Sequence, residues 1–412
     1  MRKLLSCFVA VCLLSMLFVS CSGKENIGSS QIANNESSMI SENETASVSS
    51  KANEDDEIES KTESEGIKKY KAGETAQLGC FHLNMGNCDA LGSDWDSREA
   101  EFRLICEQKY FNTYMIGAGQ YALKEAQIIA ENGGSIWFSA GHFNSKTGNL
   151  DSMIENFKFY IDYLTAKGYG DLINGFFWDE PLWKGMTNED FLLQSEALYK
   201  NFGLRLFPVF SLGSFSKVEG NELLSELRPD GPVKIDPNCF KYVSDAGFDN
   251  YGVDVREGAE NGGAKKYSDW QTLLSPEVKD GKSFYVEAKK LLQKSMGHPV
   301  NIWYYPCAFS DAVWGGLGGI KTADEDYCVA HLEFMADDIL KEEYVGGLII
   351  YTYYTFSNKT NYGFGRRADI KGEDGKYALY PEQEKWPKYS KLLKETTKRF
   401  NNVKVKKVDI NL

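Results

Sequence analysis

The chain has 412 residues, of which 42% are hydrophobic and 25% charged, and its formal net charge at pH 7 is −13. These proportions are those of an ordinary globular protein. The negative charge argues against nucleic acid or an anionic membrane surface as the main partner, because both select a basic face. The length suits several average domains or a single α/β barrel.

The N-terminus has the features of an export signal. Arg2 and Lys3 precede the apolar stretch 4–17, which is too short to span a membrane comfortably. Small Ser20 before Cys21 then resembles a bacterial lipobox. The resemblance implies that residues 1–20 are removed and that Cys21 carries the lipid that anchors the protein to the extracellular face of a membrane. An ordinary secretory signal cleaved nearby is the alternative.

Residues 21–71 are predicted to be a disordered tether between that lipid and a folded domain over 72–412. The tether is rich in Ser, Asn, Glu and Lys and has no aromatic residue before Tyr70, so it cannot bury enough apolar surface to offset its ordering entropy. Six cysteines remain in the domain without a CxxC pair, and a zinc ribbon is therefore not expected.

Eight short apolar segments are predicted to be β-strands. Runs of this length that are apolar nearly throughout are typical of strands covered on both faces. The segments are 76–81, 113–116, 135–138, 175–178, 205–210, 250–253, 301–305 and 347–351.

The longer segments between them are predicted to be helices. Apolar residues at helical spacing indicate a helix over 151–166. Three others begin with a capping-box spacing, which satisfies the free backbone N–H groups at a helix start: Asp96 with Glu99 for 98–110, Thr187 with Asp190 for 191–202, and Thr322 with Glu325 for 326–341. Eight strands alternating with helices indicate an α/β protein with a (β/α)8 TIM barrel. A doubly wound open sheet is the alternative, but 83–87 lacks its glycine-rich turn.

Two acidic residues at the end of the fourth predicted strand are the main candidates for chemistry. Active sites of such barrels lie at the C-terminal ends of the strands, and Asp179 and Glu180 follow the apolar run 175–178. Strict pleating would point the two side chains to opposite faces, but Pro181 favours a departure of Glu180 from the pleat. Two carboxyl groups at one mouth suit the hydrolysis of a glycosidic bond. The alternative is a helix cap or a structural ion pair.

The motif Trp178-Asp179-Glu180-Pro181 resembles the acidic motif of glycoside hydrolase family 123, and 302–307 and 346–351 look like two further strands of that family. The resemblance covers these three short patches, and the chain has no room for the family's accessory β domains. It implies a substrate-assisted retaining mechanism. In that mechanism Glu180 is the general acid and later the base, Asp179 orients the 2-acetamido group of a β-linked N-acetylhexosaminide, and Tyr305 donates to its oxygen.

A conventional glycosidase with two carboxyl groups is the alternative mechanism. Common retaining barrel hydrolases have a glutamate at the end of strand seven, whereas 304–308 hold no acidic residue. Asp254, after the sixth predicted strand, or Asp311 on a loop would then be the second carboxyl group beside Glu180, and Asp254 is the better candidate. Neither a metal nor a cofactor is expected, because His82 and His142 lack the paired spacing of a barrel metallohydrolase.

Substrate binding is expected from side chains near the predicted strand ends, where aromatic rings can stack on the apolar faces of sugars. Core packing is the alternative for each aromatic residue, and Trp183 is a further candidate of that kind. The expected binding residues are His82, Asn84, His142, Trp178, Tyr251, Trp303, Tyr305 and Tyr353.

The sequence thus predicts a monomeric glycoside hydrolase that acts on an extracellular oligo- or polysaccharide or glycoconjugate and is held to the membrane by a lipid. Two other classes of protein remain open, a non-catalytic carbohydrate-binding surface lipoprotein and an adhesin or scaffold. The acidic pair at 179–180 favours the hydrolase over both.

Overall fold

The computed structural model of the protein describes the barrel part of the chain, within the unit Ile67–Leu412. The predicted signal peptide, the tether and Cys21 lie outside the described residues, as do His82, Tyr251, Asp254 and Tyr353. In the described part, no helix combines the length and apolar character needed to cross a membrane. The described residues are 74–81, 83–85, 95–117, 121–211, 215–217, 224–228, 231–249, 266, 268, 296–306, 308–311, 325–351, 361–363, 386–408 and 410.

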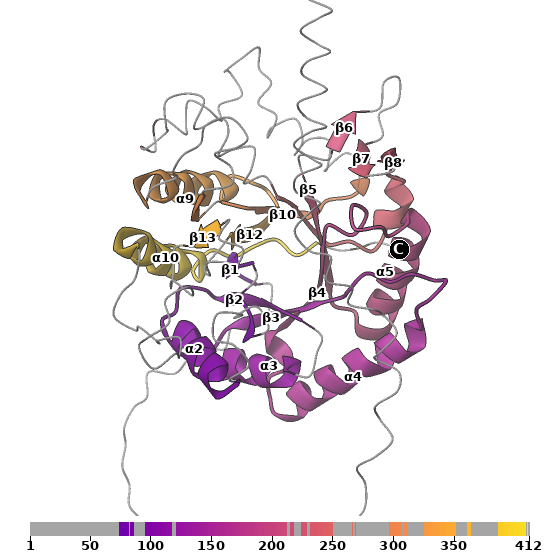
Figure 1. The fold of residues 1–412 in the computed structure, drawn as a ribbon, viewed down its shortest axis with the longest axis horizontal. Helices are drawn as coiled ribbons and strands as arrows, with labels where there is room; N and C mark the ends of the chain where they lie inside the picture. Colours follow the sequence, from indigo (N-terminus) through magenta and orange to yellow (C-terminus); the bar gives the residue numbers. More distant parts are fainter. Residues whose placement is uncertain are drawn as a thin grey trace, which may run out of the picture. The chain divides into compact units, whose positions relative to one another are not determined.

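Eight parallel strands form one sheet that curls into a barrel, with helices around the outside (Figure 1). The strand order is β1-β12-β10-β9-β5-β4-β3-β2, and β2 lies against β1 so that the sheet nearly closes. The fold is therefore the predicted (β/α)8 TIM barrel. Its strands are β1 (Gln77–Cys80), β2 (Thr113–Ile116), β3 (Ser135–Ser139), β4 (Ile173–Asp179), β5 (Arg205–Ser211), β9 (Asp245–Asp249), β10 (Asn301–Tyr304) and β12 (Val345–Ile350).

The helices begin close to the predicted positions. Thr187 caps α5, since its hydroxyl accepts the N–H of Asp190 at 3.0 Å, as the capping box predicts. The Asp190 carboxylate instead accepts the N–H of Ser145 at 3.1 Å. The predicted Asp96 cap is wrong, because the helix already includes Trp95. The α-helices are α2 (Trp95–Glu107), α3 (Ala122–Glu131), α4 (Leu150–Ala166), α5 (Asn188–Phe202), α9 (Glu325–Ile339) and α10 (Pro387–Phe400), and the 3-10 helices are η3 (Gly170–Leu172) and η5 (Pro237–Phe240).

Two small antiparallel sheets that the sequence did not predict follow barrel strands in the chain. One pairs β11 with β13, and the other joins β6, β7 and β8 after β5. Their bounds are β6 (Phe215–Lys217), β7 (Leu224–Arg228), β8 (Gly231–Lys234), β11 (Phe309–Asp311) and β13 (Asn361–Gly363).

The sixth barrel strand was predicted wrongly. It was expected at 250–253, but β9 runs over Asp245–Asp249 and pairs with β5 and β10. The physical reason is that β9 begins with Asp245, a fully buried carboxylate inside the barrel. The sequence of β9 begins and ends with an aspartate, so it does not contain the apolar run by which the other strands were predicted.

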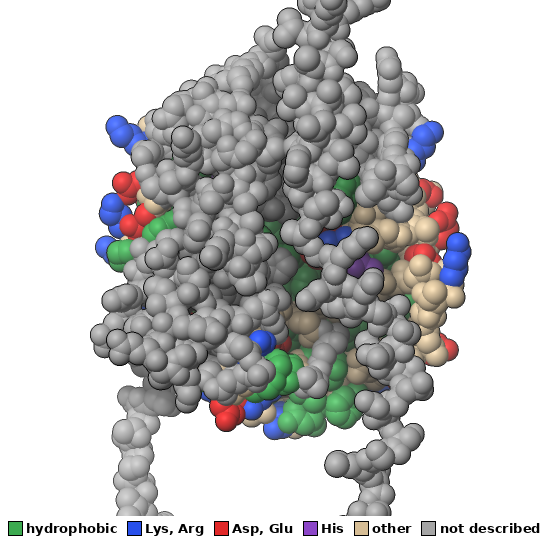
Figure 2. All heavy atoms as spheres, in the orientation of Figure 1, with side chains coloured by type: hydrophobic (Ala, Val, Ile, Leu, Met, Phe, Trp, Pro, Cys, Tyr) green, Lys and Arg blue, Asp and Glu red, His purple; other side chains and the backbone are tan. Residues whose placement is uncertain are grey.

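The pleat of each strand divides its side chains between two apolar cores. On β4, Phe177 points into the barrel, while Phe176 and Trp178 point outward to the helices. The interior core also contains Trp137, Phe207 and Trp303, whose rings contact one another. On the face shown in Figure 2, the charged side chains of the described residues lie mainly around the edge.

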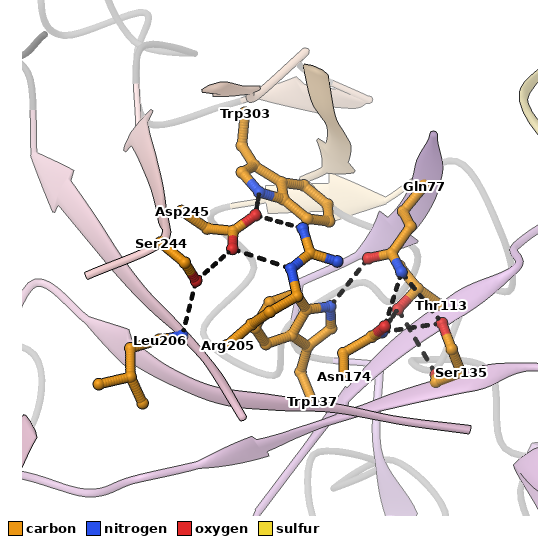
Figure 3. Close-up of polar contacts among 10 residues, drawn as sticks. All are labelled: Gln77, Thr113, Ser135, Trp137, Asn174, Arg205, Leu206, Ser244, Asp245 and Trp303. Carbon is orange, nitrogen blue, oxygen red and sulfur yellow. Dashed lines mark hydrogen bonds and ion pairs between the residues drawn. The ribbon is translucent and has the colours of Figure 1, made fainter. Parts of the chain in front are cut away.

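The N-terminal half of the barrel interior is polar (Figure 3). On one side, the Gln77 amide donates to Asn174 at 2.8 Å, and the Trp137 indole N–H donates to Gln77 at 3.1 Å. On the other, Arg205 forms a two-pronged ion pair with Asp245, one hydrogen bond of which is 2.9 Å long. Because buried polar groups are costly without partners, these linked side chains specify which strands stand side by side.

A glycine at the start of β4 allows that strand to approach β5. A Cβ atom on Gly175, whose φ is +157°, would lie 1.9 Å from the carbonyl oxygen of Arg205. We expect Gly175→Ala to lower the free energy of unfolding in urea by more than about 2 kcal/mol, as overpacking against backbone does. Gly117→Ala is the matched control, since its Cβ would meet nothing within 4 Å. Equal unfolding midpoints for the two variants would contradict this account.

Candidate active site

The chain leaves the barrel after Asp179 through a strained residue. Glu180 has φ +49°, a left-handed conformation that is uncommon for a residue other than glycine. Its N–H still donates to the carbonyl of Val209 on β5 at 2.9 Å, so the strain begins where the sheet ends. Backbone strain of this kind is held in place by its surroundings and is concentrated at functional sites.

A tight turn follows and returns the chain over the end of β4. The N–H of Lys184 donates to the carbonyl of Glu180 at 2.9 Å, and that of Met186 donates to Pro181 at 3.0 Å. Leu182 and Met186 are buried and fix the turn to the core. Lys184 is thereby held above the two acidic residues.

Both carboxylates converge on the Lys184 ammonium. Asp179 forms a close ion pair with it, and the Glu180 Oε2 atom lies 3.8 Å from its Nζ. The side chains of Asp179 and Glu180 are 26% and 18% exposed, so both remain accessible from solvent. The left-handed turn at Glu180 thus overrides the alternation of the strand, and the two acidic side chains share one site.

His142, after β3, lies on the same strand end. Its Nε2 is 2.8 Å from the backbone carbonyl of Asp179. A carbonyl only accepts hydrogen bonds, so Nε2 carries the proton. Partial burial against the end of β4 lowers the pKa of His142, and the nearby Lys184 ammonium acts in the same direction, whereas the bond to Asp179 opposes them. The hydrogen bond from Nε2 holds the imidazole against the end of β4.

Trp178 does not face the site, and its predicted contact with substrate is wrong. The indole is 1% exposed and packs on Phe191 of α5. Its N–H donates to Gln194 at 2.8 Å, and the Gln194 amide donates to the carbonyl of Ala140 at 2.7 Å. Trp178 and Asp179 are adjacent in the strand, so their side chains point to opposite faces of the sheet. Trp178 therefore packs behind the site and supports it.

Trp303 and Tyr305 are likewise core residues. Trp303 is fully buried in the barrel interior and donates to Asp245 at 2.9 Å, so the prediction that it binds substrate is wrong. Tyr305 is 2% exposed and packs edge-on against Phe81, with ring centroids 6.3 Å apart. It leaves no ring surface on which a sugar could stack.

Asn84 lies half-buried in the loop after β1, which is fixed by a buried acid. The Glu125 carboxylate accepts the N–H of Met85 at 2.6 Å, and Arg98 donates to the carbonyl of Met85 at 2.9 Å. This loop follows the C-terminal end of β1, as the predicted role of Asn84 requires.

Burial raises the pKa of Glu125 to about 7, against a smaller lowering by its bond to Met85. A carboxyl group with a raised pKa binds its proton more tightly in the folded state, so it contributes stability below its unfolded pKa, and that contribution is lost as pH rises through about 7. We expect unfolding in urea to show a loss on the order of 3 kcal/mol between acidic and neutral pH from this group. Glu125→Gln should remove this slope, whereas the exposed Glu107→Gln should keep it. A slope unchanged in Glu125→Gln would refute the assignment.

Lys184 is the residue of the site that the sequence did not indicate. It follows Glu180 by four residues, a spacing that suggests a pair only once the chain is known to turn between them. Among the described residues, no group of three His, Cys, Asp or Glu side chains is placed to hold a metal ion.

Similar folds occur among solved glycoside hydrolases. A family 5 mannosidase from Rhizomucor miehei, in complex with mannosyl-fructose, has a TM-score of 0.44 and 12% identity over 81% of this chain and 98% of its own. A β-glucuronidase from an uncultured Clostridium sp. has a TM-score of 0.41 and 13% identity over 74% of this chain and 47% of its own. One from Ruminococcus gnavus, in complex with D-glucuronic acid, has a TM-score of 0.41 and 13% identity over 74% and 46%.

No protein-family model and no curated protein matches the chain. The resemblance to glycoside hydrolase family 123 is therefore not shown. At these identities and TM-scores, the solved structures carry no argument about the reaction, and the function rests on the geometry of the site.

Proposed function

We propose that the chain is a glycoside hydrolase in which Glu180 is the general acid. The observation that carries the proposal is the convergence of Asp179 and Glu180 on Lys184 at the C-terminal end of β4. Adjacent residues of a regular strand point apart, and only the strained turn at Glu180 brings these two together. A pair of carboxyl groups at the mouth of a barrel suits acid catalysis of glycosidic bond cleavage.

The two carboxylates lie at different distances from the Lys184 ammonium, and this difference suggests their roles. Asp179 is in close contact with the ammonium, whereas Glu180 lies at 3.8 Å. In the proposed reaction, Glu180 donates its proton to the glycosidic oxygen as the bond to the anomeric carbon breaks. The tightly held Asp179 carboxylate accepts the N–H of the sugar's 2-acetamido group and orients it.

The carbonyl oxygen of the same acetamido group attacks the anomeric carbon and forms a cyclic oxazolinium intermediate. Water then adds to that carbon and reopens the ring, and it gives its proton to Glu180, so that the enzyme returns to its starting state with retention of configuration. The proposed substrate is a β-linked 2-acetamido sugar. Trp183, which is half-exposed in the turn that carries Lys184, is the proposed stacking surface in place of the buried aromatic residues.

The test is release of 4-nitrophenol from a panel of aryl glycosides by the chain from residue 21 onward. Activity confined to 2-acetamido sugars supports the proposal. Activity on sugars without that group would shift the second role to another carboxyl group, for which Asp254 is the candidate. Saturable binding of oligosaccharides without turnover of either aryl glycosides or oligosaccharides would show that the chain is a carbohydrate-binding protein and not a hydrolase.

We further propose that Cys21 carries a lipid that holds the enzyme on the extracellular face of the membrane. The support is the sequence of residues 1–21, a charged start, a short apolar stretch and a small residue before the cysteine. Cys21→Ser is expected to move the protein from the membrane to the soluble fraction and to remove the lipid mass from the N-terminal peptide.

A further inference from the structure

The end of the barrel opposite the acidic pair carries a basic edge, defined here as Lys404, Lys406 and Lys407. The chain after α10 runs along this end beside the residues that lead into β1. The N–H of Ala76 donates to Val403 at 3.0 Å, and that of Val405 donates to Glu74 at 3.1 Å. The three lysine side chains are exposed, whereas Val403 and Val405, on either side of Lys404, are partly buried on the core.

A cavity of about 940 Å³ shows that the basic edge lies at the N-terminal ends of the barrel strands. Its lining includes all three lysines and the residues at the N-terminal ends of the strands, among them Asn174, Arg205 and Asn301. Since the strands are parallel, this face is opposite to the one that holds Asp179 and Glu180. The basic edge and the candidate active site therefore point in opposite directions.

This face is positive although the chain as a whole carries −13. Seven lysines stand against four carboxylates in the last residues before each barrel strand and in the chain after α10, taken as 74–76, 108–112, 132–134, 167–172, 203–204, 241–244, 296–300, 340–344 and 401–408. Lys406 pairs with Glu343 at 2.6 Å, and among the described residues neither Lys404 nor Lys407 has an ion pair. The residues are Lys109, Lys167, Lys241, Lys341, Lys404, Lys406 and Lys407 against Glu74, Asp171, Glu342 and Glu343.

The chain also enters the barrel at this face. Glu74, the first described residue, lines the cavity beside the basic edge. Residues 21–73 separate it from Cys21 in the sequence, and a random coil of that many residues has an end-to-end distance on the order of 40 Å. A lipid on Cys21, as proposed above, would therefore keep the chain near anionic headgroups, whose attraction for lysines acts only within about one Debye length of the surface.

We propose that the basic edge docks on the anionic headgroups of the membrane that holds Cys21, so that the mouth of the barrel faces away from the bilayer. This inference rests on the proposed lipid anchor and not on the proposed reaction. Docking in this orientation leaves Asp179, Glu180 and Lys184 open to an extracellular saccharide.

The test uses the chain from residue 21 with Cys21→Ser, so that no lipid contributes, and vesicles of phosphatidylcholine with or without phosphatidylglycerol. Cosedimentation is expected only with the anionic vesicles and should weaken as salt rises. The variant K404Q/K406Q/K407Q should bind tenfold to a hundredfold more weakly, since each lysine near an anionic surface contributes several-fold. The matched control K146Q/K158Q/K391Q changes the charge equally at exposed sites elsewhere and should bind like the parent.

Equal binding to neutral vesicles, or equal weakening by the two triple variants, would overturn the proposal. Unfolding midpoints in urea check that both variants are folded. The single variants K404Q and K407Q provide the same test with a smaller perturbation, and each should weaken binding about fivefold. Because the readout is binding without turnover, loss of the proposed hydrolase activity would not affect this result.

Discussion

Glu180→Gln is expected to lose about a thousandfold in kcat on a substrate whose leaving group is a sugar, and much less on a 4-nitrophenyl glycoside. General acid catalysis contributes factors of this size, and a sugar alkoxide cannot leave without a proton, whereas 4-nitrophenolate can. The isosteric amide keeps the size of the side chain and removes its acidic proton. The measurement is kcat for both substrates with the parent and the variant.

Asp179→Asn should lower kcat on both leaving groups by a similar factor, because orientation of the acetamido group affects the attack and not the protonation. Glu189→Gln, an exposed acid in the first turn of α5, is the matched control and should leave kcat unchanged. A loss in Glu180→Gln that is equal for the two leaving groups would assign Glu180 a role other than the acid.

Asp245→Asn is expected to lower the free energy of unfolding by about 3–5 kcal/mol, the cost of leaving a buried charge without its counterion. Asp245 is fully buried and accepts hydrogen bonds from Arg205, from Trp303 at 2.9 Å and from Ser244 at 2.7 Å (Figure 3). An asparagine keeps one acceptor oxygen but no negative charge, and its NH₂ group would face donors. Unfolding in urea measures the difference.

Asp337→Asn is the matched control. Asp337 pairs with Arg399 on the surface, where the side chains are 40% and 46% exposed, so its loss should cost less than about 1 kcal/mol. The double variant Arg205→Met with Asp245→Leu should recover most of the stability lost in Asp245→Asn, since it removes both buried charges. A loss below about 1 kcal/mol for Asp245→Asn would show that the ion pair does not stabilise the barrel.

Sequence reasoning located most of the barrel because its strands are buried on both faces. Seven of the predicted strands overlap the strands of the structure, and the start of α5 at Thr187 was predicted correctly. β9 was missed because its buried aspartate is stabilised by Arg205, which lies 40 residues away in the chain. A local apolar pattern contains no information about such a partner.

The candidate site was likewise predicted in part from the sequence and in part became evident only from the tertiary structure. The sequence by itself determined that Asp179 and Glu180 stand at the C-terminal end of β4, since a charged pair must end an apolar strand. Only the tertiary structure decided that both reach Lys184, because this requires the left-handed turn at Glu180. Which aromatic residues are buried was also decided there, since the register of the pleat turns Trp178 to the helices and Trp303 into the barrel.

The distribution of charge on the surface also depends on the tertiary structure. The net charge of −13 belongs to the sequence alone and argued against an anionic partner. The basic edge arises only when the chain after α10 folds back beside Glu74 and Thr75. A sum over residues is fixed by composition, whereas a local field depends on which residues the fold brings to one face.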